Sequence, residues 1–395
     1  MKILVTDGNT LPALAITRSL GNAGHEVIVG YQHKHSLAGY SKYATGKCIY
    51  PNPIDDTAAF IDFLVDYVEF NNIDAIFPVT DITTLPITKN RDLLNSNCKI
   101  PFGNYKVVDS AANKAHIFDQ AKKLDIDIPE SITIKNYTQL ENTDITIPYP
   151  LVIKPARSRV LTEAGWLFTT VTYAKDANDL DEQLSKYSKD IFPIILQEKI
   201  VGPGLGIFMC LDKGKSVAAF SHRRIREKPP SGGVSVLRES VPLDPLALDF
   251  SEKLLKSINW QGVAMVEFKI DTRDNRPKLM EINGRFWGSL QLAIHSGVDF
   301  PKLLADSLDD KAVSPITNYN FGVKTRWLWG DIDALLIRIL KSSNSQLLPN
   351  GADNKLKYTL KFLKFWEPKL YYDVLRLSDI KPWLFESIQW FKRLV

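Results

Sequence analysis

Short apolar segments alternate with helix-length segments over the first part of the chain, and this alternation restricts the fold more than any other feature. Residues 3–6 and 24–29 have the pattern of strands on either side of a helix at about 11–23, and a second helix at 57–71 leads into an apolar strand at 75–79. Strands and helices that alternate in this way pack as a mostly parallel sheet covered by helices. The sequence therefore predicts an α/β, Rossmann-like domain over residues 1–105.

The turn after the first expected strand, Asp7-Gly8-Asn9, lies where a dinucleotide-binding domain would hold a pyrophosphate. Thr10 and Pro12 occupy positions where the G-x-G-x-x-G pattern requires glycine, so the backbone cannot approach a pyrophosphate closely. We expect this domain to be a scaffold that binds no dinucleotide.

After residue 105 the pattern changes to a mixed α+β region and then to a basic tail. Strands are predicted near residues 149–155, 165–173, 194–201 and 262–270, in two subdomains at about 106–190 and 191–310. From Val323 onward the chain has 13 Lys or Arg against 7 Asp or Glu, and the tail holds five of the eight tryptophans. We expect residues 311–395 to form a mainly helical, basic, Trp-rich C-terminal extension.

Composition and simple motifs exclude several classes of protein. The N-terminus becomes polar within six residues and no apolar run approaches the ~20 residues of a membrane-spanning helix, which predicts a cytoplasmic location. The cysteines, Cys48, Cys98 and Cys210, are odd in number and far apart, so we expect reduced thiols. The sequence contains neither H-E-x-x-H nor G-x-S-x-G, and a net charge of +4 is too small to indicate a nucleic-acid partner.

The strongest group of candidate site residues lies in segment 262–283, where two apolar strands flank a polar turn. Glu267 and Glu281 are each seven residues from Asp274, so symmetric pairing places them opposite one another in a hairpin, with Asn283 on the same face. Two carboxylates this close share a proton or bind a cation, and two carboxylates with an amide oxygen suit Mg²⁺. The alternative is a slipped register in which both glutamates face solvent or nearby lysines.

Two charged residues upstream lie where a nucleotide could meet them. Lys154 ends the apolar strand 151–153, where its ammonium could contact a phosphate. Glu198 follows Ile194 and Leu196 on one strand face, and a buried carboxylate there needs a donor such as an adenine amine or a ribose hydroxyl. Taken singly, each is equally explained as an ordinary charge at a strand end.

Five segments, in this order and spacing, resemble the ATP-grasp superfamily over about residues 114–301. They are Lys114, the strand ending in Lys154-Pro155, the segment Gln197-Glu198-Lys199-Ile200, the strand around Glu267, and Glu281-Ile282-Asn283-Gly284-Arg285. The strand–helix units before them resemble the domain that precedes the ATP-grasp fold in such enzymes.

This resemblance implies a role for each matching residue. Lys114 and Lys154 would contact the ATP phosphates, Glu198 would accept from the adenine amine, and the segment from Gln197 through Lys199 and Ile200 would frame the adenine ring. Glu267, Glu281 and Asn283 would hold Mg²⁺, and Arg285 would meet the transferred phosphoryl group.

The sequence departs from the family pattern at two places. Segment 157–165 lacks the usual glycine-rich lid, so Arg157 and Arg159 are expected to close over the phosphates instead. The acidic residue that commonly binds ribose is absent from segment 202–206.

The resemblance implies an ATP- and Mg²⁺-dependent carboxylate–amine ligase that forms an acylphosphate. Segment 222–235 gathers cations before a Gly-Gly turn, so Arg224 or Arg226 could bind the carboxylate of the acyl donor there; the alternative is an exposed basic strand and turn. A carboxyphosphate-forming enzyme resembling carbamoyl-phosphate synthase or biotin carboxylase, and a nucleotide-binding regulatory module without turnover, are the alternatives. The expected partners are a small carboxylate and an amine, and a homo-oligomer is compatible with the sequence. Aromatic and basic helices in the tail either pack on their own domain or contact an anionic membrane or a protein.

Overall fold

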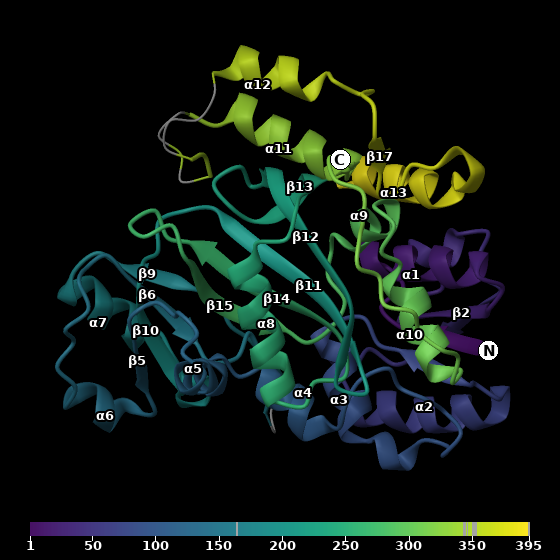
Figure 1. Cartoon of the computed structure of the whole chain (residues 1–395), viewed down its shortest axis with the longest axis horizontal. Helices are drawn as coiled ribbons and strands as arrows, with labels where there is room; N and C mark the ends of the chain where they lie inside the picture. Colours follow the sequence, from purple (N-terminus) through teal and green to yellow (C-terminus); the bar gives the residue numbers. More distant parts are fainter. Residues whose placement is uncertain (163–164, 343–344, 346, 350–353, 394–395) are drawn as a thin grey trace.

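The computed structural model describes residues 1–162, 165–342, 345, 347–349 and 354–393, and these residues form a mixed α/β molecule (Figure 1). The described strands form a parallel four-stranded sheet, an antiparallel four-stranded sheet, a seven-stranded sheet and a two-stranded hairpin. The predicted α/β class is therefore confirmed. None of the described helices combines the length and the apolar character needed to traverse a bilayer.

The N-terminal part is the parallel sheet that the alternation predicts. Its strands have the order β3-β2-β1-β4, and every neighbouring pair is parallel. The Thr10 hydroxyl accepts a hydrogen bond from the Ala13 N–H and caps the first helix, so the residue that replaces a glycine has a structural function here. The elements are β1 Lys2–Val5, α1 Leu11–Asn22, β2 Glu26–Tyr31, η1 Ala38–Tyr40, β3 Gly46–Ile49, α2 Thr57–Asn71, β4 Ala75–Phe77, α3 Asp81–Lys89 and η2 Arg91–Leu93.

A small antiparallel lobe follows, with strand order β5-β10-β6-β9. It has its own buried cluster, which includes Leu151, Ile153 and Leu196 and is separate from the large core that runs through the rest of the molecule. The elements are α4 Tyr105–Ala111, α5 Lys114–Lys123, β5 Ser131–Ile134, α6 Tyr137–Glu141, β6 Leu151–Pro155, β7 Arg159–Thr162, β8 Gly165–Phe168, β9 Thr172–Ala174, α7 Ala177–Ser185, η3 Lys189–Ile191 and β10 Ile194–Glu198.

The seven-stranded sheet forms the centre of the molecule, in the order β15-β14-β11-β12-β13-β16-β17 (Figure 1). Its first two strands are the hairpin predicted at segment 262–283. The elements are β11 Gly204–Asp212, β12 Lys215–Lys228, β13 Val234–Ser240, α8 Pro245–Ser257, β14 Gly262–Ile270, β15 Pro277–Asn283, α9 Leu290–His295 and α10 Phe300–Leu308.

The tail differs from the helical extension expected for residues 311–395, because two of its segments are strands that extend the large sheet. Strand β16, Lys324–Arg326, pairs antiparallel with β13, and β17, Leu370–Tyr372, pairs parallel with β16. The other described elements are α11 Leu328–Leu340, α12 Lys355–Phe362, η4 Leu377–Asp379 and α13 Lys381–Lys392. The tail is therefore partly built into the sheet.

Buried ion pairs connect the tail to the rest of the molecule. Arg18 of α1 donates through Nε to Asp379 Oδ2 at 2.8 Å and through Nη1 to the Asp373 carbonyl at 2.9 Å. Asp331 of α11 accepts from Arg326 and from Arg226 of β12, and the Asp331 and Arg326 side chains have no exposed surface. Because a buried charge is costly unless it is paired, these contacts hold the tail against the N-terminal sheet and the central sheet.

Candidate active site

Glu267 and Glu281 lie opposite one another on β14 and β15, as predicted. The route to this pairing differs from the expected symmetric hairpin. Beyond the turn, Ile270 pairs with Pro277 and Phe268 with Leu279, a register that would set Glu267 opposite Met280. A register shift between Glu267 and Phe268 moves the pairing by one residue and brings Glu281 into place.

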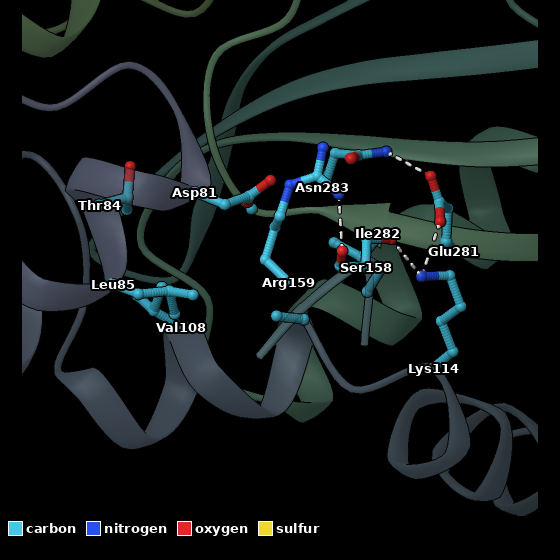
Figure 2. A pocket seen from close by; sticks show the side chains of 12 residues that line it. Asp81, Thr84, Leu85, Val108, Lys114, Ser158, Arg159, Glu281, Ile282 and Asn283 are labelled. Atoms are coloured by element: carbon cyan, nitrogen blue, oxygen red, sulfur yellow. Dashed lines mark hydrogen bonds and ion pairs between the residues drawn. The ribbon is translucent and has the colours of Figure 1, made fainter. Parts of the chain in front are cut away.

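The Glu281 carboxylate meets a lysine and an amide (Figure 2). Lys114, at the start of α5, lies 3.1 Å from Glu281 Oε2, and Asn283 Nδ2 donates to Glu281 Oε1 at 3.0 Å. Burial raises the pKa of Glu281, but Lys114 and Asn283 outweigh it and leave that pKa lowered. Glu281 therefore carries its negative charge readily.

The neighbouring Glu267 is shifted in the opposite direction. Burial raises the pKa of Glu267. The Arg224 guanidinium, whose Nη2 lies 3.1 Å from Glu267 Oε1, opposes this rise, and the negative charge of Glu281 adds to it. The net result is a raised pKa. The two pKa values are shifted apart because the neighbouring carboxylates repel each other and have different partners.

Lys154 faces this pair from β6 of the antiparallel lobe. Its Nζ donates to Gln197 Oε1 at 2.7 Å, and burial, opposed by the charge of Glu281, lowers the pKa of Lys154 to about 8. An anion in the same space would raise that pKa again.

The site suits a magnesium ion that takes only some of its ligands from the protein, here Glu267, Glu281 and Asn283. They offer two carboxylates and one amide oxygen, and Asn283 Oδ1 now accepts from Arg285 Nη2 at 3.1 Å. Among the described residues no group of three or more His, Cys, Asp or Glu side chains could hold a metal. Mg²⁺ commonly takes one or two carboxylates and completes its shell with water and phosphate oxygens, so this donor set is sufficient when a nucleotide is present.

A cavity of about 440 Å³ separates the lobe from the hairpin. Lys114, Lys154, Glu267 and Glu281 line one part of it, and the predicted segment from Gln197 to Ile200 lines another. The structure thus brings Glu267, Glu281 and the predicted nucleotide residues to one cavity, which Asn283 does not line.

The segment that connects β10 to β11 packs closely against the β14–β15 hairpin at Gly202. A Cβ atom at Gly202, whose φ is 153°, would lie 1.7 Å from the Ile270 carbonyl oxygen, so only glycine allows this approach. Beside it, Glu198 accepts from Arg273 Nη2 at 2.8 Å and from the Glu130 N–H at 3.0 Å. The acceptor expected to await adenine is therefore engaged by an arginine that the sequence analysis did not identify.

A second cavity, of about 300 Å³, adjoins the first and is lined by several arginine side chains. Glu267 and Glu281 line both cavities. The second is also lined by Arg224, Arg238, Arg285, His222, Trp287 and Ser289. The carboxylate pair thus lies between a larger space bordered by lysines and a smaller one bordered by arginines.

His222 was not identified as a site residue from the sequence. It is buried, its Nε2 lies 2.7 Å from Ser289 Oγ, and its Nδ1 has no partner among the described residues. Burial, followed by the charges of Arg238 and Arg224, holds the pKa of His222 well below its usual range, so the ring is neutral. Its alternation with Arg224 along β12 was the signal available in the sequence.

The two arginines proposed to grip a carboxylate do different things. Arg224 lines the second cavity, between Glu227 at 3.0 Å and Glu267 at 3.1 Å. Arg226 instead donates to Asp331 of the tail, with its Nε 2.7 Å from Oδ1. Register shifts on both sides of Arg226 explain the difference, because they turn its side chain away from the face that Arg224 occupies.

Arg157 and Arg159, which were expected to close over the phosphates in place of a glycine-rich lid, also have different surroundings. Arg157 forms a two-pronged ion pair with Asp109 of α4, with distances of 2.6 and 2.9 Å, and Arg159 stacks on Phe168 while lining a small pocket beside Asn283. Residues 163 and 164 of the lid segment lie outside the described residues. Only Arg159 of the two is thus directed toward the site.

Asp81 is a further site residue that sequence analysis missed. It begins α3, shortly after the end of β4, and accepts from Arg285 Nε at 3.1 Å. Figure 2 shows its side chain beside that of Asn283. Arg285 also donates to Asn283, so the N-terminal sheet orients the last residue of the Glu-Ile-Asn-Gly-Arg segment. Carboxyl ends of parallel strands are where ligands meet such sheets, and that rule was the available signal.

Comparison with known proteins identifies relatives of this chain. Residues 190–330 match the family model described as ATP-grasp in the biosynthetic pathway with Ter operon. The D-alanine–D-alanine ligase of Rickettsia peacockii (strain Rustic) is 24% identical over 226 residues, which cover 53% of this chain and 67% of that protein.

Solved structures share the fold at low sequence identity. L-amino acid ligase from Bacillus licheniformis superposes with a TM-score of 0.61 at 16% identity, covering 80% of this chain and 78% of that chain. The biotin carboxylase domain of the Hydrogenobacter thermophilus 2-oxoglutarate carboxylase, solved with MgADP, ADP and bicarbonate, gives 0.64 at 14% identity, covering 82% and 73%. The resemblance to ATP-grasp proteins that the sequence predicted is thereby confirmed: the family model matches residues 190–330, and the relatives and solved structures include ligases of this kind.

Proposed function

We propose that the protein is an ATP- and Mg²⁺-dependent carboxylate–amine ligase that works through an acylphosphate. One observation supports this above all others: the Glu267–Glu281 pair lines two adjoining cavities, one bordered by lysines and the other by arginines. Transfer of a phosphoryl group needs a nucleotide and an acceptor on opposite sides of the group that moves. The paired carboxylates lie at such a boundary.

In this proposal the larger cavity takes ATP. Lys114 and Lys154 meet its phosphates, and the segment from Gln197 to Ile200 borders the base. Glu198 is bound to Arg273, so an adenine amine would have to share or replace that partner. Glu267, Glu281 and Asn283 would hold Mg²⁺, which neutralises charge on the transferred group when it is bound.

The smaller cavity takes the acyl donor. Arg224 lies where it can bind the donor carboxylate, and Arg285, oriented by Asp81, lies where it can meet the phosphoryl group. A carboxylate oxygen attacks the γ-phosphorus and ADP leaves. An amine then attacks the acyl carbon, the bond to the phosphate oxygen breaks, and the amine loses a proton as phosphate departs.

The division into domains belongs to the same proposal. A Rossmann-like part over residues 1–105 would precede two ATP-grasp subdomains at 106–190 and 191–310, followed by the tail. The separate buried cluster of the antiparallel lobe supports the first ATP-grasp subdomain as a unit that can move relative to the central sheet. Closure of this lobe would exclude water from the transferred group.

Release of ADP and phosphate by the purified protein tests the proposal. We expect release only with Mg²⁺ and with members of an amino-acid and amine pool, and we expect a product mass equal to the two substrates less water. Release that requires bicarbonate and no amino acid would instead support a carboxyphosphate-forming enzyme. Stoichiometric ATP binding with no ADP formed across the pools would support a regulatory module and overturn the ligase.

A further inference from the structure

The outward face of helix α12 combines exposed apolar side chains with exposed lysines. Leu356, Leu360 and Leu363 recur at helical spacing and are 69%, 58% and 55% exposed, and Trp366 just beyond the helix is 85% exposed. Large apolar side chains gathered on one surface mark contact sites more often than scattered ones do. We call these four residues the α12 ridge.

The opposite side of the same helix is fixed to the protein. Phe362 is buried, its ring lies under the Arg326 guanidinium at 4.4 Å, and Arg326 Nη2 donates to the Phe362 carbonyl at 2.9 Å. At the start of the helix Lys355 Nζ donates to the Ile339 carbonyl of α11 at 2.6 Å. The helix is thus held in place by one face. Helix α12 lies beside α11 at the outer edge of the molecule (Figure 1), and the four ridge side chains are exposed.

Exposed lysines lie beside the ridge. Segment 354–366 contains four lysines and no acidic residue, and Lys355, Lys357, Lys361 and Lys364 are all exposed. On a helical projection of α12, Lys357 and Lys361 flank one side of the leucines, and Lys364 follows just after the helix. A helix with leucines on one face, lysines beside them and a tryptophan just past its end suits the boundary between lipid headgroups and acyl chains.

We propose that the α12 ridge and its lysines dock the protein on an anionic lipid bilayer. A second copy of the chain is a poorer occupant, because a symmetric contact would set the lysines of one copy against those of the other. A specific protein partner is also less suited, since a stable interface buries roughly 1,200 Å² or more in total and the ridge has four large side chains on about two helical turns. A bilayer accepts a single amphipathic helix and rewards the added positive charge.

Co-sedimentation of the full chain with vesicles tests this docking. We expect sedimentation with phosphatidylcholine vesicles that contain phosphatidylglycerol, weakening with added salt, and little sedimentation with phosphatidylcholine alone. The triple variant Leu356→Ser/Leu360→Ser/Leu363→Ser should reduce the partition coefficient about tenfold or more, because those side chains supply the apolar contact. Lys357→Gln/Lys361→Gln/Lys364→Gln should remove the preference for the anionic vesicles.

Two matched variants control for general stickiness and charge. Phe70→Ser removes an equally exposed apolar side chain from α2, and Lys122→Gln/Lys123→Gln removes exposed charge from α5; both should sediment like the wild type. Circular dichroism and thermal unfolding should be unchanged in the ridge variant. Its ADP release without vesicles should also match the wild type, which separates this inference from the proposed ligase.

Three results would overturn the inference. The first is wild-type protein that stays in the supernatant with anionic vesicles at low salt, and the second is a ridge variant that sediments as well as the wild type. The third is a concentration-dependent dimer, abolished by the leucine substitutions, in a protein that ignores vesicles; it would assign the ridge to a second copy instead.

Discussion

The cleft formed by the two adjoining cavities and the C-terminal tail both contain ion pairs, but these pairs lie in different surroundings. In the cleft, Lys114–Glu281 and Arg224–Glu267 border cavities and keep part of their surface exposed. In the tail, Asp331 lies between Arg226 and Arg326 with no exposed surface of its own. The residue types are nearly the same, so the adjoining space decides which pairs can receive a ligand and which hold the fold together.

The largest expected effect breaks the tail side of this comparison. Asp331→Ala should lower the free energy of unfolding by about 3–5 kcal/mol, because it leaves two buried guanidinium groups without their carboxylate. Urea denaturation would measure this loss. Asp309→Ala, at an exposed position, should unfold at the same urea concentration as the wild type. An unchanged midpoint for Asp331→Ala would show that the pair contributes nothing.

The next effect belongs to the cleft. Glu281→Gln keeps the shape of the side chain but removes the charge that we propose binds Mg²⁺, and we expect kcat to fall about 10²- to 10³-fold with an unchanged thermal unfolding curve. Steady-state ADP release measures it, with the surface substitution Glu252→Gln on α8 as the control. Full activity in Glu281→Gln would remove the metal assignment.

Two arginines on one strand sharpen the comparison further. Arg224→Ala should lower kcat/KM for the acyl donor by about 10- to 100-fold while the protein remains stable. Arg226→Ala should destabilise the fold and leave the kcat of the folded fraction near that of the wild type. Measuring unfolding and kinetics for both variants decides this, and a reversed outcome would mean that the second cavity is not the donor site.

The smallest effect is a pH dependence. The pKa of Lys154, about 8, lies below its unfolded value because of burial, and a bound triphosphate would raise it, so nucleotide binding takes up a proton near and above that pH. Affinity for ADP should therefore fall as pH rises through 8, by at most about tenfold per pH unit. Calorimetry in buffers of different ionisation enthalpy would detect the proton. Lys154→Met should bind more weakly and show a flatter profile; an equally steep profile would assign the proton elsewhere.

The sequence correctly predicted that Glu267 and Glu281 lie opposite one another, but the symmetric hairpin from which this was inferred is wrong. Counting from Asp274 placed Glu267 opposite Glu281, but the turn follows a register one residue away from that symmetry. The register shift beside Phe268 restores the pairing. A shift of this kind depends on packing from both sides of the sheet, which a single sequence does not display.

Other features depended on contacts between distant segments. Alternation along a strand sets Arg224 and Arg226 on the same face, and only the register shifts around Arg226 separate them. The tail strands β16 and β17 have three residues each and gain their stability from the sheet they join, so local pattern does not identify them. The link from Glu198 to Arg273 likewise arises only when β10 meets the hairpin.

The contact between Arg18 and Asp379 has a consequence for the order in which parts of the protein fold during synthesis. The two residues are 361 positions apart, so the guanidinium of the first helix leaves the ribosome long before its carboxylate has been synthesised. Until then Arg18 has to remain hydrated, because dehydrating it alone is costly. The amino-terminal sheet therefore reaches its final packing only after translation of the region around Asp379, and a nascent chain stalled before that point would keep this face open to chaperones.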